Sequence, residues 1–201
     1  GDITKKILSD FRDNGGIFIK EHFLNYEIRN LEPLCGTYKS YKICSMPPPS
    51  SGGVAIIQML NILENFDLLN LGHNSSDYVR IVCEAMKRAT IDKDLFVGDP
   101  NFLTVPTEHL IDKKYAFEQS NDIQNGKIAD VKRLSTKTES KDTTHLSVID
   151  SNGNAVSMTH SLGMPSGVIT SGLGFMYNGC MGVFDPRPGN ADYISPGKSR
   201  F

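Results

Sequence analysis

The spacing of hydrophobic positions changes its period at about residue 143. Before this point, apolar side chains recur at the three- to four-residue spacing that is typical of amphipathic helices. The clearest case predicts a helix with Ser75 or Ser76 as its N-terminal cap, and its apolar face comprises Tyr78, Ile81, Val82, Ala85, Met86 and Ala89. Weaker patterns of the same kind predict helices over 3–11, 54–66 and 107–118, the last capped by Thr107.

From Thr144 onward the period is two, as expected of β-strands. Residues 144–150 and 154–161 are therefore predicted to pair as an antiparallel hairpin that turns at Asn152-Gly153, a dipeptide typical of such turns. One face of the return strand carries small or hydroxylated side chains, namely Ala155, Ser157, Thr159 and Ser161. Such a face suits a site where a molecule approaches the sheet closely, and it equally suits a plain solvent-exposed face.

Two shorter segments, 17–19 and 37–45, are also β-rich and predict strands. The segment 119–142 is polar and poor in aromatic residues, which predicts a mobile linker that ends directly before Thr143.

Composition excludes some classes of function. The net charge of −2 gives no electrostatic reason to expect nucleic acid or an anionic membrane as a partner. No apolar run reaches the roughly 18 residues that predict a membrane-spanning helix, so we expect no membrane segment in this chain. The first ten residues lack the apolar core of a signal peptide.

The four cysteines, at positions 35, 44, 83 and 180, form no C-x-x-C pair and have no histidine at zinc-ligand spacing. We therefore expect no metal and no cofactor. Cys44 and Cys83 fall in apolar periodic segments, so we interpret the cysteines as buried free thiols, which favours a reducing compartment.

Two segments together resemble the γ-glutamyltransferase family. The first is SMPPPSSGGVAIIQMLNILENFD at 45–67, and the second is TTHLSVIDSNGNAVSMTHSL at 143–162. Their order, and the polar stretch between them, also resemble that family, and weaker similarity covers nearly the whole chain, including 98–100 and 195–198.

The resemblance implies an α+β fold, the four-layer αββα sandwich of the N-terminal-nucleophile hydrolases, of which this chain covers a part. It also implies a precursor that cuts itself before Thr143. Residues 1–142 then belong to a large subunit that ends in the linker, and residues 143–201 belong to a small subunit. The implied partners are these two subunits and a small-molecule amide or γ-glutamyl substrate.

The resemblance makes Thr143 the nucleophile, and elementary chemistry agrees with that role. A free α-amine has a pKa of about 7.7–8.0, so part of it is neutral and can take the hydroxyl proton. One residue then supplies nucleophile and base, and no imidazole is required. We accordingly expect His145, which shares the face of Thr143, to be a packed or hydrogen-bonded histidine.

Ser161 stands where the family has a second threonine that contacts the nucleophile and aids self-cleavage, and a serine keeps the hydroxyl. The alternative is an ordinary strand serine.

The positions that hold the donor's α-amino group in the family are altered here. They match Gly163, Cys180 and Val183, none of which carries a carboxylate. A buried ammonium without a carboxylate partner is costly, so the usual γ-glutamyl donor is not expected to be held in the usual way. Asp185 is a weaker candidate for the missing acid, since its spacing differs by two residues.

The family's carboxylate-binding arginine corresponds to a position upstream of residue 1, and its oxyanion hole to positions downstream of Phe201, so the chain resembles the middle of a longer protein. Two functions remain open. The first is an amide hydrolase or acyl transferase acting through an acyl-enzyme on Thr143, with glutathione, another γ-glutamyl compound or a different small acyl amide as donor. The second is a non-catalytic relative that has lost the donor amine site.

Overall fold

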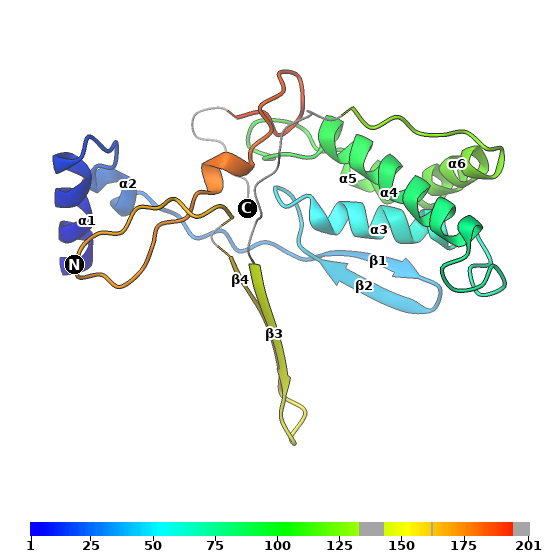
Figure 1. Ribbon diagram of the computed structural model, residues 1–201, viewed down its shortest axis with the longest axis horizontal. Coiled ribbons are helices and arrows are strands. Elements are labelled where there is room, and N and C mark those ends of the chain that lie inside the picture. The colour runs from blue at the N-terminus through cyan, green and yellow to red at the C-terminus, as the bar shows by residue number, and fades with distance from the viewer. Residues whose placement is uncertain (133–142, 162, 195–201) are drawn as a thin grey trace. The chain divides into compact units, whose positions relative to one another are not determined.

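The computed structural model describes residues 1–132, 143–161 and 163–194, and it contains helices and strands in an α+β arrangement (Figure 1). The chain divides into two compact units, each made of two separate stretches. Unit 1 comprises 1–30 and 138–183, and unit 2 comprises 31–137 and 184–201.

Unit 2 contains a β-hairpin followed by helices. Its elements are β1 (Leu34–Tyr38), β2 (Tyr41–Ser45), α3 (Gly52–Leu63), α4 (Ser76–Phe96), α5 (Thr107–Leu110) and α6 (Lys113–Gln124). Helix α3 is central, because α4, α6 and both strands of the hairpin pack on it (Figure 1). Ser75 caps α4 by accepting a hydrogen bond from the backbone N–H of Tyr78, which confirms the predicted start of that helix.

Buried apolar residues explain this packing. One cluster joins α3, α4 and α6 and consists of Ile62, Ile81, Ala85, Ala116 and Ile123. A second cluster consists of Val54, Val97 and Leu110, with Leu34 of β1 packed against it. Ile81 and Ala85 lie on the predicted helical face, whereas Ile123 lies in the segment that was expected to be a linker. Burying each large side chain contributes about 1.5–3 kcal/mol.

A hydrogen-bonded polar group also lies within the helical core. Asp92 of α4 accepts from the amide of Gln58 in α3, and from the Tyr115 hydroxyl of α6 at 2.9 Å. Burial and the neighbouring carboxylate raise the pKa of Tyr115 above its usual range, so this hydroxyl stays protonated and remains a donor. The group therefore ties together the three helices that also share the apolar core.

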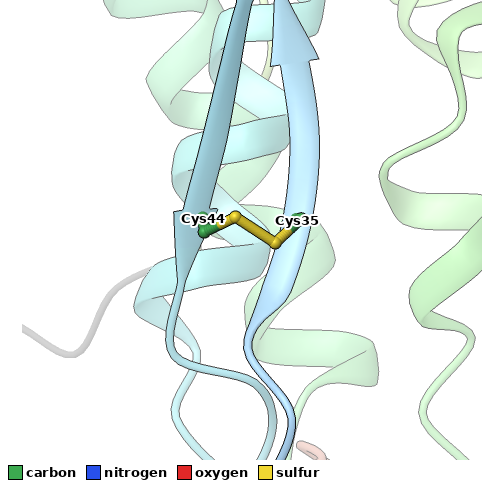
Figure 2. The surroundings of a disulfide bond; sticks show 2 residues. All are labelled: Cys35 and Cys44. Atoms are coloured by element: carbon green, nitrogen blue, oxygen red, sulfur yellow. A yellow bond between two sulfur atoms is a disulfide. The ribbon is translucent and has the colours of Figure 1, made fainter.

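The structure corrects the interpretation of the cysteines. Cys35 and Cys44 face each other across β1 and β2 and form a disulfide (Figure 2). Cys83 is exposed rather than buried. Four free thiols were expected because the two strands of the hairpin were taken as one strand. In a single strand, positions 35 and 44 could not have been recognised as cross-strand partners. The argument for a reducing compartment falls with that expectation.

Three expectations about elements of unit 2 were also wrong. The segment 37–45 is a hairpin with its turn at Lys39-Ser40, rather than one strand. The segment 107–118 is two helices, because the Asp112 side chain accepts from the N–H groups of Lys114 and Tyr115 and starts a new helix there. Helix α6 continues to Gln124, so the first part of the expected linker is helical, whereas 133–142 lies outside the described residues.

Unit 1 contains α1 (Asp2–Asp13), α2 (Lys20–Leu24), β3 (Thr143–Ile149), β4 (Ala155–Ser161) and the 3-10 turn η1 (Cys180–Val183). β3 and β4 pair antiparallel around the Asn152-Gly153 turn, which confirms the predicted hairpin (Figure 1). All residues of both strands are exposed.

The segment 17–19 forms no strand, contrary to expectation. Its central side chain instead packs within unit 1, where the rings of Phe11 and Phe18 meet edge to face with centroids 4.8 Å apart. Phe11 also meets Tyr177 at 5.3 Å, and Thr170 donates to the carboxylate of Asp10. These contacts join α1 to the segment that follows β4.

No helix within the described ranges combines the length and the apolar character that crossing a membrane requires.

The start of α3 generates a stability prediction. Gly53 is buried, and a Cβ placed there would lie 2.1 Å from the backbone oxygen of Met46, so Gly53→Ala must displace backbone. We expect the substitution to lower the free energy of unfolding of the full-length protein by about 1–3 kcal/mol, the usual cost of overpacking. Thermal unfolding measures the effect.

The preceding residue is a matched control. A Cβ on Gly52 would come no closer than 3.9 Å to the Ser50 hydroxyl, so Gly52→Ala should leave the unfolding midpoint unchanged or slightly higher. Equal destabilisation by both substitutions would contradict the close approach at Gly53.

Candidate functional site

The register of the β3–β4 hairpin places Thr143 directly opposite Ser161. Their side chains are on the same face of the sheet, and the two hydroxyl oxygens, Thr143 Oγ1 and Ser161 Oγ, are 3.0 Å apart, within hydrogen-bond distance. The two residues that the sequence singled out are thus in contact. Thr143 is the first residue of β3 and Ser161 is the last residue of β4, so the pair lies at the open end of the hairpin.

The hydroxyl pair is one end of a polar ladder on this face. Next along the strands, His145 Nδ1 lies 2.8 Å from the Thr159 hydroxyl. The other ring nitrogen, Nε2, lies 3.1 Å from Ser147 Oγ and 3.2 Å from Ser157 Oγ. His145 is therefore hydrogen-bonded, as expected, and it contacts hydroxyls of both strands. The sequence pattern identified the hydroxyl positions of β4 but gave no role to Ser147, whose partner is visible only once the register is known.

The segment after β4 connects Ser161 to the positions that the resemblance assigns to the donor's amine. The backbone N–H of Gly163 donates to Ser161 Oγ at 3.1 Å. The N–H of Gly179 donates to the Met164 carbonyl at 2.6 Å, and this contact brings the beginning of η1 next to the chain that leaves β4. Gly163 and Cys180 are the sequence neighbours of the two residues that this hydrogen bond joins.

The 3-10 turn η1 begins at Cys180 and ends at Val183, so two of the three altered positions bound a single turn. The N–H of Cys180 donates to the side-chain oxygen of Asn178 at 3.0 Å, which fixes the start of the turn. Gly163, Cys180 and Val183 carry no carboxylate, so none of the three positions supplies an anionic side chain.

Asp185 has other partners. It belongs to unit 2, where Arg187 Nε lies 2.8 Å from Oδ1 and 3.0 Å from Oδ2. The Asn190 amide donates to Oδ2 at 2.7 Å. The Arg187 guanidinium, with these hydrogen bonds, holds the pKa of Asp185 well below its usual range. A carboxylate already neutralised by an arginine is a poor ligand for a second cation.

The arrangement around Thr143 has the elements of a nucleophilic site. Among the residues that the structure describes, no group of three histidine, cysteine, aspartate or glutamate side chains could hold a metal ion. Thr143 instead offers an exposed hydroxyl with a second hydroxyl beside it, and its own α-nitrogen begins the strand. A hydroxyl in that setting becomes a competent nucleophile once an adjacent base accepts its proton.

Comparison with known proteins identifies relatives of the chain. The sequence is 38% identical to the glutathione hydrolase proenzyme of Escherichia coli (strain K12) over 94% of this chain and 34% of that protein. It is 40% identical to the acylase ACY 1 proenzyme of Pseudomonas sp. (strain SE83) over 100% of this chain and 36% of that protein. The chain thus spans about a third of the length of the curated relatives it matches.

Solved structures give the same picture. The cephalosporin acylase of Bacillus halodurans matches with a TM-score of 0.78 at 27% identity, over 98% of this chain and 35% of that one. The γ-glutamyltranspeptidase of Helicobacter pylori matches with a TM-score of 0.60 at 43% identity, over 62% of this chain and 36% of that one. The family model described as gamma-glutamyltranspeptidase matches residues 1–201. The chain therefore belongs to the γ-glutamyltranspeptidase family.

Proposed function

We propose that the full-length protein is a precursor that cleaves itself before Thr143 and then acts as an amide hydrolase or acyl transferase. The observation that carries the proposal is the 3.0 Å contact between the hydroxyls of Thr143 and Ser161 at the start of β3. The proenzyme names of the relatives from Escherichia coli and Pseudomonas support processing of this kind.

In the proposed reaction, Thr143 Oγ1 attacks the amide carbonyl of the donor. Its proton passes to the free α-amine of Thr143 and from there to the departing amine as the carbon–nitrogen bond breaks. The acyl group is then an ester on Thr143. Water, or an acceptor amine, attacks this ester, and the threonine hydroxyl is regenerated with its proton. Ser161 supports both stages by hydrogen-bonding to Thr143 Oγ1, the oxygen that attacks the amide and later leaves from the ester.

The altered amine site supports a donor other than the γ-glutamyl group. Cys180 and Val183 bound η1 without a carboxylate, and Asp185 is held by Arg187. Two of the similar proteins are named as acylases, one of them a cephalosporin acylase. We propose a small acyl amide whose acyl group lacks the α-ammonium as the preferred donor, with γ-glutamyl compounds such as glutathione as poorer ones.

The exposed hairpin supports a larger assembly around it. A two-stranded hairpin is marginal by itself, and Leu146, Val148, Val156 and Met158 present apolar side chains on the face opposite Thr143. We propose that β3 and β4 belong to one sheet of an αββα sandwich formed by the full-length protein. Residues up to 142 would then be part of the large subunit, and residues from 143 part of the small one.

The altered amine site also favours a second candidate, a non-catalytic relative that keeps the fold. The hydroxyl pair argues against it, because a structural protein has no need for two contacting hydroxyls at that point. Self-cleavage discriminates between the two.

We predict that the full-length precursor separates into two pieces between Asp142 and Thr143. N-terminal sequencing of the smaller piece should start Thr-Thr-His-Leu. Thr143→Ala should remain one band on a denaturing gel because it removes the nucleophile, whereas Thr143→Ser, which keeps the hydroxyl, should still be cut. An intact wild-type chain, or a different first residue, would refute the assignment of Thr143.

A second prediction concerns Ser161. Ser161→Ala removes the hydroxyl that contacts Thr143 Oγ1 and should slow self-cleavage about 10- to 100-fold, the worth of one hydrogen bond to a developing charge. Ser161→Thr retains that hydroxyl and serves as the matched control, so its rate should stay within a few-fold of wild type. The measurement is the disappearance of the precursor band with time; indistinguishable rates for the two variants would remove Ser161 from the site.

A third prediction concerns donor choice. A γ-glutamyl anilide and a glutaryl anilide differ only in the α-amine, so their kcat/KM ratio reports how the site treats that ammonium. Without a carboxylate at 163, 180 or 183, the preference for the glutamyl donor should be below about 10-fold, or about 1.4 kcal/mol. A thousandfold preference would mean that another acid holds the ammonium and that the protein is a true γ-glutamyl transferase.

A further inference from the structure

Arg187 joins three segments of unit 2 that are distant in the sequence. Its Nη2 forms an ion pair with Asp94 near the end of α4 at 2.7 Å, and its Nη1 donates to the backbone carbonyl of Lys132. On its own segment it pairs with Asp185. The side chains of Arg187, Asp94 and Asp185 are 26%, 14% and 14% exposed, so these contacts are largely shielded from solvent.

The segment around Arg187 is preassembled for this contact. Asp185 also accepts from the backbone N–H of Arg187 at 2.8 Å, so the arginine is fixed by a short turn. The N–H of Ala191 donates to the Asp94 carbonyl at 2.9 Å. The Ala191 carbonyl in turn lies against Gly98, where a Cβ would be only 2.5 Å from it. Backbone and side chain therefore dock the same segment on the end of α4.

The proposed cut before Thr143 places these partners in different polypeptides. Arg187, Asp185 and Asn190 fall on the small-subunit side, whereas Asp94 and Lys132 fall on the large-subunit side. Lys132 is only eleven positions before Thr143, so it belongs to the stretch that ends at the cut. Before cleavage the chain itself keeps the partners together; afterwards only non-covalent contacts do so.

We infer that these residues, which we call the Arg187 clamp (Arg187, Asp185, Asn190, Asp94 and the Lys132 carbonyl), hold the two subunits together after self-cleavage. The inference rests on the proposed cut before Thr143. It goes beyond the catalytic proposal because it assigns an inter-subunit contact to residues outside the nucleophile's hairpin.

The clamp has the chemistry of a durable interface. An arginine that pairs with two carboxylates and a carbonyl uses its several donors at once, as its planar guanidinium allows and a lysine does not. Arg187 lowers the pKa of Asp185 well below the ordinary value. Stability from a lowered carboxylate pKa is present above the unfolded value of about 3.9 and is lost only as the pH falls through the folded pKa. The clamp should therefore persist in mildly acidic solution.

The test uses the full-length protein with Arg187→Ala and Arg187→Lys. In the cleaved protein, Arg187→Ala should raise the dissociation constant of the two subunits at least 10-fold, measured by sedimentation or native mass spectrometry in moderate urea. Arg187→Lys should give a smaller increase, because a lysine keeps the charge and reaches fewer acceptors at once. In an uncleaved Thr143→Ala background, Arg187→Ala should lower the unfolding midpoint far less than it does in the cleaved protein, since the chain still links both sides.

Arg80→Ala is the matched control. Like Arg187, Arg80 combines ion pairing with a carbonyl hydrogen bond: it pairs with Asp77 at 3.6 Å and donates to the Ile123 carbonyl at 3.3 Å. All its partners lie on the large-subunit side, so its loss should leave subunit dissociation unchanged. The inference is overturned if Arg187→Ala and Arg80→Ala change the dissociation constant of the two subunits by the same amount. It is also overturned if Arg187→Ala destabilises the cleaved and uncleaved proteins equally, which would make it a purely internal contact.

A second arm separates the clamp from the proposed function. A specific protease site inserted directly before residue 143 in the Thr143→Ala protein allows the chain to be cut without self-cleavage. If wild-type precursor fails to cut itself but Arg187→Ala still loosens the protease-cut pieces, the catalytic proposal fails and the clamp stands. If self-cleavage occurs but the clamp variants have no effect in either arm, only the clamp is wrong.

Discussion

The pairing register of β3 and β4 is the constraint on which the candidate site depends. Because successive side chains of a strand point to opposite faces, a shift of one residue would turn Thr143 away from Ser161 and onto the apolar face. The observed register instead aligns Thr143 with Ser161, His145 with Thr159 and Ser147 with Ser157. His145 hydrogen-bonds to side chains of both strands. These side-chain contacts therefore favour the same alignment of β3 and β4 as the backbone hydrogen bonds do.

The two units illustrate two ways of fixing a polar group. In unit 2, Asp92 lies among helices and is satisfied by Gln58 and Tyr115, so its position follows from a packed interior. In unit 1, the hydroxyls of Thr143 and Ser161 lie on an exposed hairpin and are positioned by strand pairing and by the Gly163 N–H. An exposed pair positioned by backbone stays accessible to solvent, which a group in a packed interior does not.

Much of the fold could be predicted because its signals are local. The Asn152-Gly153 turn and the alternation around it specify the hairpin, and Ser75 with a helical apolar face specifies α4. The site pair followed from the resemblance alone. By contrast, the Cys35–Cys44 disulfide depends on a register between two strands that were taken as one. The ion pair of Arg187 with Asp94 spans 93 positions and has no local signature.

The close approach of the Ala191 carbonyl to Gly98 has a consequence for how substitutions combine. A side chain at position 98 would push away the segment that carries Arg187, so Gly98→Ala would itself loosen the contacts with Asp94 and Lys132. Replacing Arg187 in the Gly98→Ala protein would then cost less free energy, because its contacts with Asp94 and Lys132 would already be weakened. The two substitutions, although 89 positions apart in the chain, would therefore be strongly epistatic, and their combined free-energy effect would be smaller than the sum of the separate ones.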